Sequence, residues 1–144
     1  NVSDVDFHLY ILGDGEDKED LIRLRKEHNL DNRISFLGNV NNPYAYMVKA
    51  HVFVLSSRFE GFPNVVLESL SCGTPVLANN CLGGINEIIK PGHNGEVFSF
   101  EKDNFEEYLK KIAVQEFNSE EIIQDAHDRF SVENKIVEFQ NNFR

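Results

Sequence analysis

The sequence predicts an α/β fold in which a parallel sheet carries helices on both faces. Short apolar runs alternate with helical segments along residues 6 to about 100, and this alternation is typical of parallel strands joined by crossover helices. The run HVFVLS at 51–56 is apolar and rich in β-branched residues, as a buried strand is. From Asp103 onward the pattern is helical throughout. We therefore expect a Rossmann-like core over about 6–100 and a helical tail over about 103–144.

The expected elements follow one another in a regular order. The strands are DFHLYIL at 6–12, RISFL at 33–37, HVFVL at 51–55, PVLA at 75–78 and EVFSF at 96–100. Helices are expected at about 16–29, at 43–49 after a cap by Asn42, from Asn64 through VVLESLS, and through NEIIK at 86–90. The tail predicts three further helices, within 104–117, 119–130 and 131–143, of which the last two begin with the serine caps Ser119 and Ser131.

The segment from Ser57 to Ala78 joins a buried strand, a loop, a helix and the next strand. Gly61 and Pro63 interrupt the chain, Asn64 is a good N-cap, and Gly73 followed by Pro75 is a helix stop signal. In an open parallel sheet such a loop lies at the carboxyl ends of the strands, where a helix N-terminus offers unpaired N–H groups. A diphosphate site is expected there.

Two carboxylates, Glu60 and Glu68, flank this turn. Glu68 falls about one turn into the helix, and because helical side chains lean toward the N-terminus, its carboxylate can reach the same site. A carboxylate accepts hydrogen bonds from two adjacent hydroxyls, which is how a ribose or hexose presents them. The alternative is structural, since the helix dipole alone favours Glu in a first turn and loop Glu is common on surfaces.

EGFPNVVLESLSCGTPV strongly resembles the signature of retaining glycosyltransferases of the GT-B fold, family 4, also called group 1. FHLYILGDGEDKEDLIRLRKEHNLDNRISFLGNV before it and NNCLGGINEIIKPGHNGEVF after it are similar to the C-terminal domain of the same family. The resemblance covers roughly residues 6 to 100. It implies the C-terminal half of a GT-B fold, present here as one truncated nucleotide-sugar-binding domain over 1–144.

The resemblance implies a role for each residue of the turn. Glu60 would be the catalytic carboxylate that lies against the donor sugar, and Glu68 would bind the ribose. The donor sugar and the diphosphate would be lined by Gly61, Phe62, Pro63, Asn64 and Val65. Because Pro63 has no N–H, the amides of Asn64 and Val65 are the expected phosphate donors. Gly38, Asn39 and Val40 resemble the segment whose backbone contacts the base.

Three further features have open alternatives. GDGEDK at 13–18 has Lys18 in place of the third glycine of a dinucleotide motif, so we expect a tight turn with Gly13 near the nucleotide at most. CLGGINEI resembles the family's loop near the donor site, where Gly83 and Gly84 allow close backbone approach; a plain turn is equally compatible. Arg58 is a candidate for part of a phosphate clamp, although an exposed loop arginine is the simpler interpretation.

The parent enzyme that the resemblance implies would move a hexose from a UDP-, GDP- or ADP-sugar to an acceptor hydroxyl with retention, in cell-surface polysaccharide or glycolipid synthesis. It would need no cofactor and no metal. A glycan or lipid-linked acceptor would be held by the N-terminal domain, which this chain lacks. The family's first strand, with an Arg and a Lys aimed at the diphosphate, also has no counterpart before Asp6. The chain alone is therefore expected to have negligible transferase activity.

The absent strand would lie between those at Leu9 and Val54. The gap predicts either a rearranged sheet, in which these two strands pair directly, or a neighbouring chain that supplies the strand and makes an oligomer.

Composition and charge bound the class of protein. The 144 residues carry a formal net charge of -10, which argues against a nucleic-acid groove and gives no polybasic signal for anionic lipid. The five histidines and two cysteines lack metal-ligand spacing. Without a membrane-spanning run or secretory leader, we expect a reduced, cytoplasmic chain whose parent is peripheral at the inner face of the membrane. A nucleotide-binding module without catalysis and a structural or partner-binding domain remain as alternatives.

Overall fold

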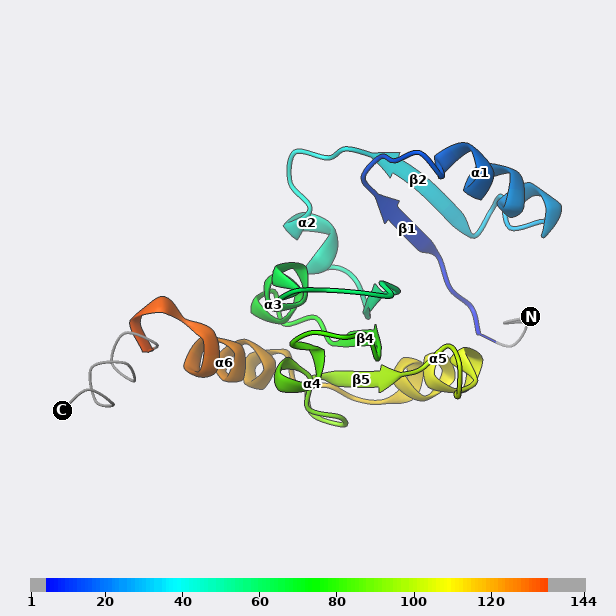
Figure 1. Ribbon diagram of the computed structural model, residues 1–144. Helices are drawn as coiled ribbons and strands as arrows, with labels where there is room; N and C mark the ends of the chain where they lie inside the picture. The colour runs from blue at the N-terminus through cyan, green and yellow to red at the C-terminus, as the bar shows by residue number, and fades with distance from the viewer. Residues whose placement is uncertain (1–4, 135–144) are drawn as a thin grey trace. The chain divides into compact units, whose positions relative to one another are not determined.

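The structure is a computed structural model that describes residues 5–134, and the chain divides into two compact units, 1–43 and 44–144 (Figure 1). Unit 1 contains β1 (Leu9–Leu12), α1 (Lys18–Glu27) and β2 (Ile34–Gly38). Its two strands pair in parallel, with Leu9 opposite Ile34. The count of one domain over 1–144 stays a prediction.

Helix α1 contacts its sheet through a charged side chain. None of the residues of α1 is buried. Arg25, in its last turn, donates a hydrogen bond to the Ile34 carbonyl at 3.1 Å and lies over the Phe36 ring, 5.6 Å from its centroid. The aliphatic stem and the planar guanidinium of an arginine suit this half-exposed position.

Unit 2 carries the rest of the α/β pattern. Its strands are β3 (Phe53–Leu55), β4 (Val76–Asn79) and β5 (Gly95–Phe98), all parallel and in the order β3-β4-β5. Its helices are α2 (Tyr44–Met47), α3 (Asn64–Ser71), α4 (Ile85–Ile88), α5 (Phe105–Val114) and α6 (Ser119–Phe130).

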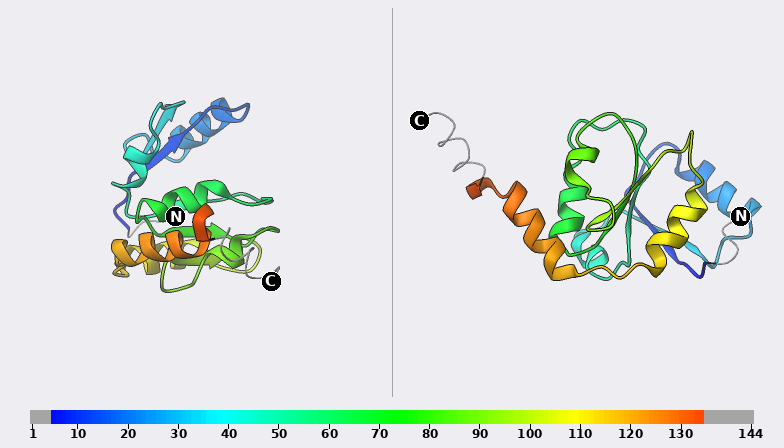
Figure 2. Two further views of the ribbon diagram at one scale, coloured as in Figure 1. Left: turned by 90° about the vertical axis from the view of Figure 1, so that its left-hand side faces the viewer. Right: turned by 90° about the horizontal axis from the view of Figure 1, so that it is seen from below.

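Side chains alternate between the two faces of this sheet. Leu55, Val76 and Ala78 pack into one apolar cluster with residues of α3, α4 and α6. Leu77 and Phe98 point to the other face and pack against α5. Figure 2, in the view from below, shows α5 on one side of the strands and α3 and α6 on the other. The predicted α/β fold, with helices on both faces and a helical tail, is confirmed.

Of the two serine N-caps predicted for the tail, Ser119 and Ser131, only the second caps a helix in the structure. Asn118, rather than Ser119, caps α6: its side-chain oxygen accepts the N–H groups of Glu120 and Glu121 at 3.1 and 3.3 Å. The prediction for Ser119 is wrong because the cap lies one residue earlier, at the last non-helical position. Ser131 accepts the Asn134 N–H at 3.4 Å, as a cap does. The rest of the third predicted helix, 135–143, lies outside the described residues.

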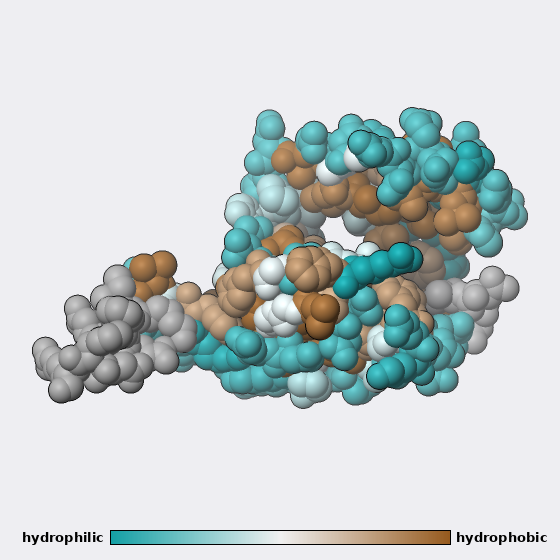
Figure 3. Space-filling model, in the orientation of Figure 1, coloured by the Kyte–Doolittle hydropathy of each residue, from teal (hydrophilic) through white to brown (hydrophobic). Residues whose placement is uncertain are grey.

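The two alternatives for the absent strand, direct pairing of the strands at Leu9 and Val54 or a strand from a neighbouring chain, both concern how unit 1 joins unit 2, and both stay predictions. Among the described strands, β1 pairs with β2 and β3 pairs with β4. Apolar side chains are open to the surface on both units (Figure 3), among them Leu21 and Leu24 of α1. Completion of the sheet by another chain therefore stays a prediction.

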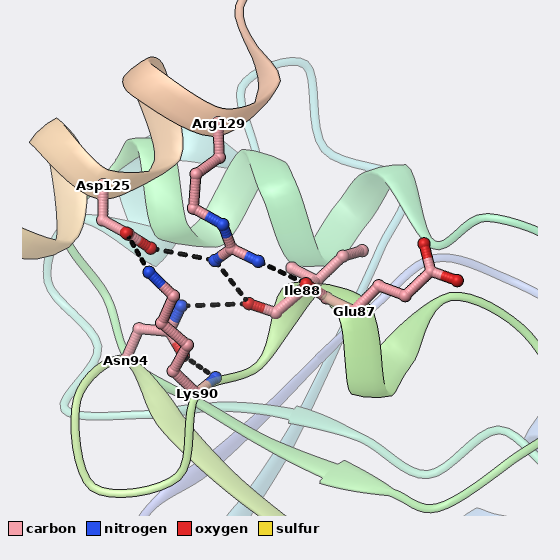
Figure 4. Close-up of polar contacts among 6 residues, drawn as sticks. All are labelled: Glu87, Ile88, Lys90, Asn94, Asp125 and Arg129. Atoms are coloured by element: carbon pink, nitrogen blue, oxygen red, sulfur yellow. Dashed lines mark hydrogen bonds and ion pairs between the residues drawn. The ribbon is translucent and has the colours of Figure 1, made fainter.

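Arg129 of α6 ties this helix to the end of α4. Its guanidinium donates hydrogen bonds to the carbonyls of Glu87 and, at 3.1 Å, Ile88, which are acceptors that a helix end leaves unpaired (Figure 4). Asp125, one turn earlier, accepts hydrogen bonds from Arg129 at 2.9 Å and from Lys90. Burial by itself would raise the pKa of Asp125, but the bonds from Lys90 and Arg129 outweigh it and lower that pKa.

We expect Asp125→Asn to lower the free energy of unfolding at neutral pH by about 2 kcal/mol, the typical value of a hydrogen bond to a charged group. Because the pKa is lower in the folded state, this stability is present above the unfolded pKa and is lost as the pH falls through the folded value. Urea denaturation measures the free energy of unfolding of wild type and variant. The difference between them should be smaller at about pH 3 than at about pH 7. Asp128→Asn, at an exposed position of the same helix, is the control. An equal difference in the free energy of unfolding at both pH values would contradict the expected pH dependence.

Candidate functional site

The loop that carries Glu60 is a continuation of β3 after a break. β3 pairs with β4 from Phe53 opposite Val76 to Leu55 opposite Ala78. The parallel bridge between Phe59 and Leu82 resumes this pairing with the same residue offset. The Glu60 N–H then donates to the Leu82 carbonyl at 3.1 Å, so Glu60 is held by main-chain pairing and not on a free loop.

Two glycines allow the paired segments to lie this close. A Cβ at Gly83 would stand 2.1 Å from the carbonyl oxygen of Glu60, and Gly83 has a φ of +128°. A Cβ at Gly84 would stand 3.0 Å from the Phe62 ring, and its N–H donates to the Gly61 carbonyl at 3.4 Å. Of the two alternatives for these glycines, close approach and a plain turn, the structure shows close approach, to the backbone of the Glu60 loop and the Phe62 ring, while proximity to a donor stays a prediction.

The start of α3 differs from the prediction that Asn64 is the N-cap. Pro63 takes the last non-helical position, with φ -80° and ψ 83°, and no side chain caps the helix. The Asn64 N–H donates to the Phe62 carbonyl at 3.0 Å and the Val66 N–H to the Pro63 carbonyl at 2.9 Å. Within residues 5–134, the Val65 N–H has no hydrogen-bond acceptor. Of the two N–H groups predicted to bind phosphate, that of Asn64 already donates to a carbonyl, and that of Val65 has no acceptor within residues 5–134.

Glu68 lies on the outer face of α3, in line with Asn64 four residues earlier. The opposite face is buried through Val66 and Leu70. Because helical side chains lean toward the N-terminus, we expect the Glu68 carboxylate to be directed toward the turn at Asn64. The structure places the Glu60 loop directly before the start of α3 and Glu68 about one turn into that helix, while a site shared by the two carboxylates stays a prediction.

A free cysteine lies near each carboxylate. Burial raises the pKa of the Cys72 thiol, and the charge of Glu68 raises it further. Burial also raises the pKa of the Cys81 thiol, to which Glu60 contributes by its charge. Both thiols are therefore poor nucleophiles at neutral pH. Arg58 is exposed and forms no ion pair with residues 5–134, in line with a surface arginine.

Gly13 and Gly38 meet in unit 1, where β1 and β2 end. The Gly13 N–H donates to the Gly38 carbonyl at 2.7 Å, and the two residues have φ of +107° and +66°. A Cβ at either glycine would meet no atom within 4 Å, so the positive φ, rather than crowding, favours glycine here. Val40 follows in the next loop and is half-buried. These candidates for contact with a base lie together within their own unit.

Asn79 is a residue of this region that the sequence did not single out. It ends β4, is 8% exposed, and its side-chain amide bonds to the backbone of Ser57 and Phe100. The sequence feature that could have identified Asn79 is a polar residue directly after the apolar run VLA. Asn80 beside it accepts a hydrogen bond from the Asn86 side chain at 3.0 Å, which closes the base of the loop at 81–85.

The described part of the chain has neither a candidate metal cluster nor a candidate membrane-spanning helix. No group of three or more His, Cys, Asp or Glu residues within 5–134 is arranged to hold a metal ion. No helix in that range has the length and apolar character needed to cross a membrane.

Comparison with known proteins shows that one family model matches nearly the whole chain. The model of the family described as Glycosyl transferases group 1 matches residues 2–134. A Campylobacter jejuni relative, N-acetylgalactosamine-N,N'-diacetylbacillosaminyl-diphospho-undecaprenol 4-alpha-N-acetylgalactosaminyltransferase, is 39% identical over 99 residues, which are 69% of this chain and 27% of the relative.

Solved structures agree with that comparison. The apo form of the lipopolysaccharide outer core galactosyltransferase WaaB superimposes with a TM-score of 0.84 and 27% identity, over 94% of this chain and 40% of that one. Anabaena HepE in complex with UDP-glucose shares the fold, with a TM-score of 0.77 and 23% identity, over 95% of this chain and 41% of that one. The chain thus spans less than half the length of each of these proteins.

Proposed function

The chain belongs to the glycosyl transferases group 1 family, and we propose that it is the part of a retaining glycosyltransferase that binds the nucleotide-sugar donor. Its fold is that of the C-terminal domain of GT-B glycosyltransferases. One observation carries the proposal: main-chain pairing with Leu82 holds Glu60 just before α3, whose Val65 N–H has no acceptor in residues 5–134.

In this proposal, each of the two carboxylates binds one of the two sugar rings of the donor. Glu60 accepts hydrogen bonds from the donor sugar and is the catalytic residue, and Glu68 accepts them from the ribose. The Val65 N–H and the positive end of the α3 dipole bind the diphosphate. The remaining lining residues are Gly61, Phe62, Pro63 and Asn64 around the sugar and diphosphate, and Gly13, Gly38 and Val40 near the base.

This arrangement fits the chemistry of glycosyl transfer. When the bond between the sugar and the diphosphate breaks, negative charge develops on the leaving phosphate, and the amino end of α3 stabilises it. Attack by the acceptor hydroxyl from the same face retains the configuration at the anomeric carbon. The transfer as proposed uses no metal and no cofactor. Since the chain spans only part of the length of its relatives, we propose that this chain alone has negligible transferase activity.

The whole protein's partners are proposed from its relatives. The complex of HepE with UDP-glucose supports a UDP-sugar among the UDP, GDP and ADP donors considered. The diphospho-undecaprenol acceptor in the name of the Campylobacter relative supports a lipid-linked acceptor, held by another domain at the cytoplasmic face of the membrane. The pathway would be the synthesis of a cell-surface polysaccharide or glycolipid. A chain that completes the sheet would make the protein an oligomer.

Calorimetric titration of the full-length protein with UDP, GDP, ADP and their glucose conjugates tests the division of roles. We expect Glu68→Ala to weaken binding of the nucleotide and the nucleotide sugar alike, by at least about tenfold, because it removes a charged hydrogen bond to the ribose. Glu60→Ala should leave the bare nucleotide unaffected and remove the extra affinity that the sugar confers.

Glu116→Ala, which changes an exposed carboxylate between α5 and α6, is the control and should bind as the wild type does. Binding of none of the three nucleotides by the wild type would contradict the proposed function. Equal losses in Glu60→Ala and Glu68→Ala for the bare nucleotide would contradict the separate roles.

A further inference from the structure

The side chain of Asn79 connects the ends of β3, β4 and β5. Its amide nitrogen donates to the Ser57 carbonyl at 2.9 Å, and its amide oxygen accepts the Phe100 N–H at 3.4 Å. These two partners settle which way the amide points, because one can only accept and the other can only donate. Ser57 follows β3, Phe100 follows β5, and Asn79 itself ends the strand between them.

The bond to Ser57 falls where the main-chain ladder is interrupted. The β3–β4 ladder stops at Leu55 opposite Ala78 and resumes as a single bridge at Phe59 opposite Leu82. Between these points, the Asn79 amide is the hydrogen bond that joins the two segments. Glu60 lies three residues beyond Ser57, so the Asn79 bond is the support immediately before the catalytic segment.

A buried asparagine here does more than fill space. Its polar atoms lose water on folding, and a hydrogen bond that offsets this loss gives little net stability. The neighbouring strand positions, Leu77 and Ala78, are apolar and fully buried, so an apolar residue would suit the local packing. What the amide adds is a defined position for the two backbone segments that it joins.

We propose that Asn79 is a positioning residue for Glu60: by bridging the break in the β3–β4 ladder, it sets where the Glu60 carboxylate meets the donor sugar. This inference rests on the proposed function. It predicts that loss of the Asn79 amide frees the segment at 57–61 and lowers affinity for the sugar part of the donor. The nucleotide part, bound through Glu68, should be unaffected.

Asn94 provides a matched control. It is also a buried asparagine of unit 2 whose amide makes two main-chain hydrogen bonds, both to the segment at 88–90: it donates to the Ile88 carbonyl at 3.1 Å and accepts the Lys90 N–H at 2.7 Å. It lies before β5, at the opposite end of the parallel strands from Glu60. Asn79→Asp and Asn94→Asp make the same chemical change at the two ends, and each replaces a donor by an acceptor.

Amide hydrogen exchange measured by NMR tests the positioning directly. In Asn79→Asp we expect the Glu60 N–H, which is bonded to Leu82, to exchange about tenfold faster, and in Asn94→Asp to exchange at the wild-type rate. If Asn79→Asp does not fold, the neutral Asn79→Ala removes the same donor. Unchanged exchange of the Glu60 N–H in the folded Asn79 variant would overturn the inference, whatever the ligand measurements show.

Titration with each nucleotide and its glucose conjugate tests the consequence. The ratio of the two affinities should fall at least about tenfold in the Asn79 variant and stay constant in Asn94→Asp, even if the latter melts at a lower temperature. Faster exchange together with an unchanged ratio would overturn the link to the donor sugar. A wild type that binds no nucleotide would contradict the proposed function instead, and the exchange measurement would still decide whether Asn79 positions Glu60.

Discussion

Gly73→Ala should lower the free energy of unfolding by about 3 kcal/mol, because it combines backbone strain with crowding. Gly73, the residue after the C-cap of α3, has a φ of +76°, and its N–H donates to the Leu70 carbonyl at 2.9 Å. The next N–H, of Thr74, reaches back to the Ser69 carbonyl at 3.1 Å, which completes a Schellman motif. A Cβ at Gly73 would lie 2.9 Å from the Cβ of Ser119, at the start of α6.

Gly92→Ala separates the two contributions. Gly92 has a similar φ, +79°, but a Cβ there would meet only the side chain of Gln115, at 3.9 Å. Its expected loss is that of strain alone, about 1 kcal/mol. Urea denaturation of both variants measures the difference, which reports how tightly the α3 turn packs on α6. Equal losses in the two variants would show that crowding at Ser119 makes no contribution.

The elements of the fold were predictable because their signals are local. An apolar run such as HVFVL, or the pair of Gly73 and Pro75 after a helical segment, restricts the backbone within a few residues. Helix starts were less predictable, since a cap depends on the backbone angles of one residue. Asn118 takes that position instead of Ser119, and Pro63 takes it before Asn64.

The site was predictable only in part, because its geometry depends on contacts distant in the sequence. The residues around Glu60 were identified from one continuous motif. The pairing of that motif with Leu82 and the amide bridge from Asn79 arise only when β3 and β4 lie side by side. A single asparagine after an apolar strand gives the same local signal as the start of any loop, so its role was not apparent.

We expect Gly83→Ala to lower affinity for the nucleotide sugar by about a hundredfold, more than the loss of either carboxylate alone. The new Cβ would stand 2.1 Å from the Glu60 carbonyl oxygen and 2.8 Å from that of Gly61, distances at which the two paired segments must separate. Separation displaces Glu60 from the sugar and shifts the turn that leads to the Val65 N–H. The loss of two charged hydrogen bonds, at about 1.5 kcal/mol each, corresponds to roughly this factor.

The cost in stability should be smaller than in Gly73→Ala, because the residues that must move are at the surface: Leu82, beside Gly83, is 76% exposed. Gly73→Ala and Gly83→Ala therefore have opposite expected effects: the first loses stability but binds donor normally when folded, and the second stays folded but binds donor about a hundredfold more weakly. Titration calorimetry and urea denaturation of both variants test this. Donor affinity at the wild-type level in a folded Gly83→Ala protein would mean that the close pairing of the two loops is not what places Glu60.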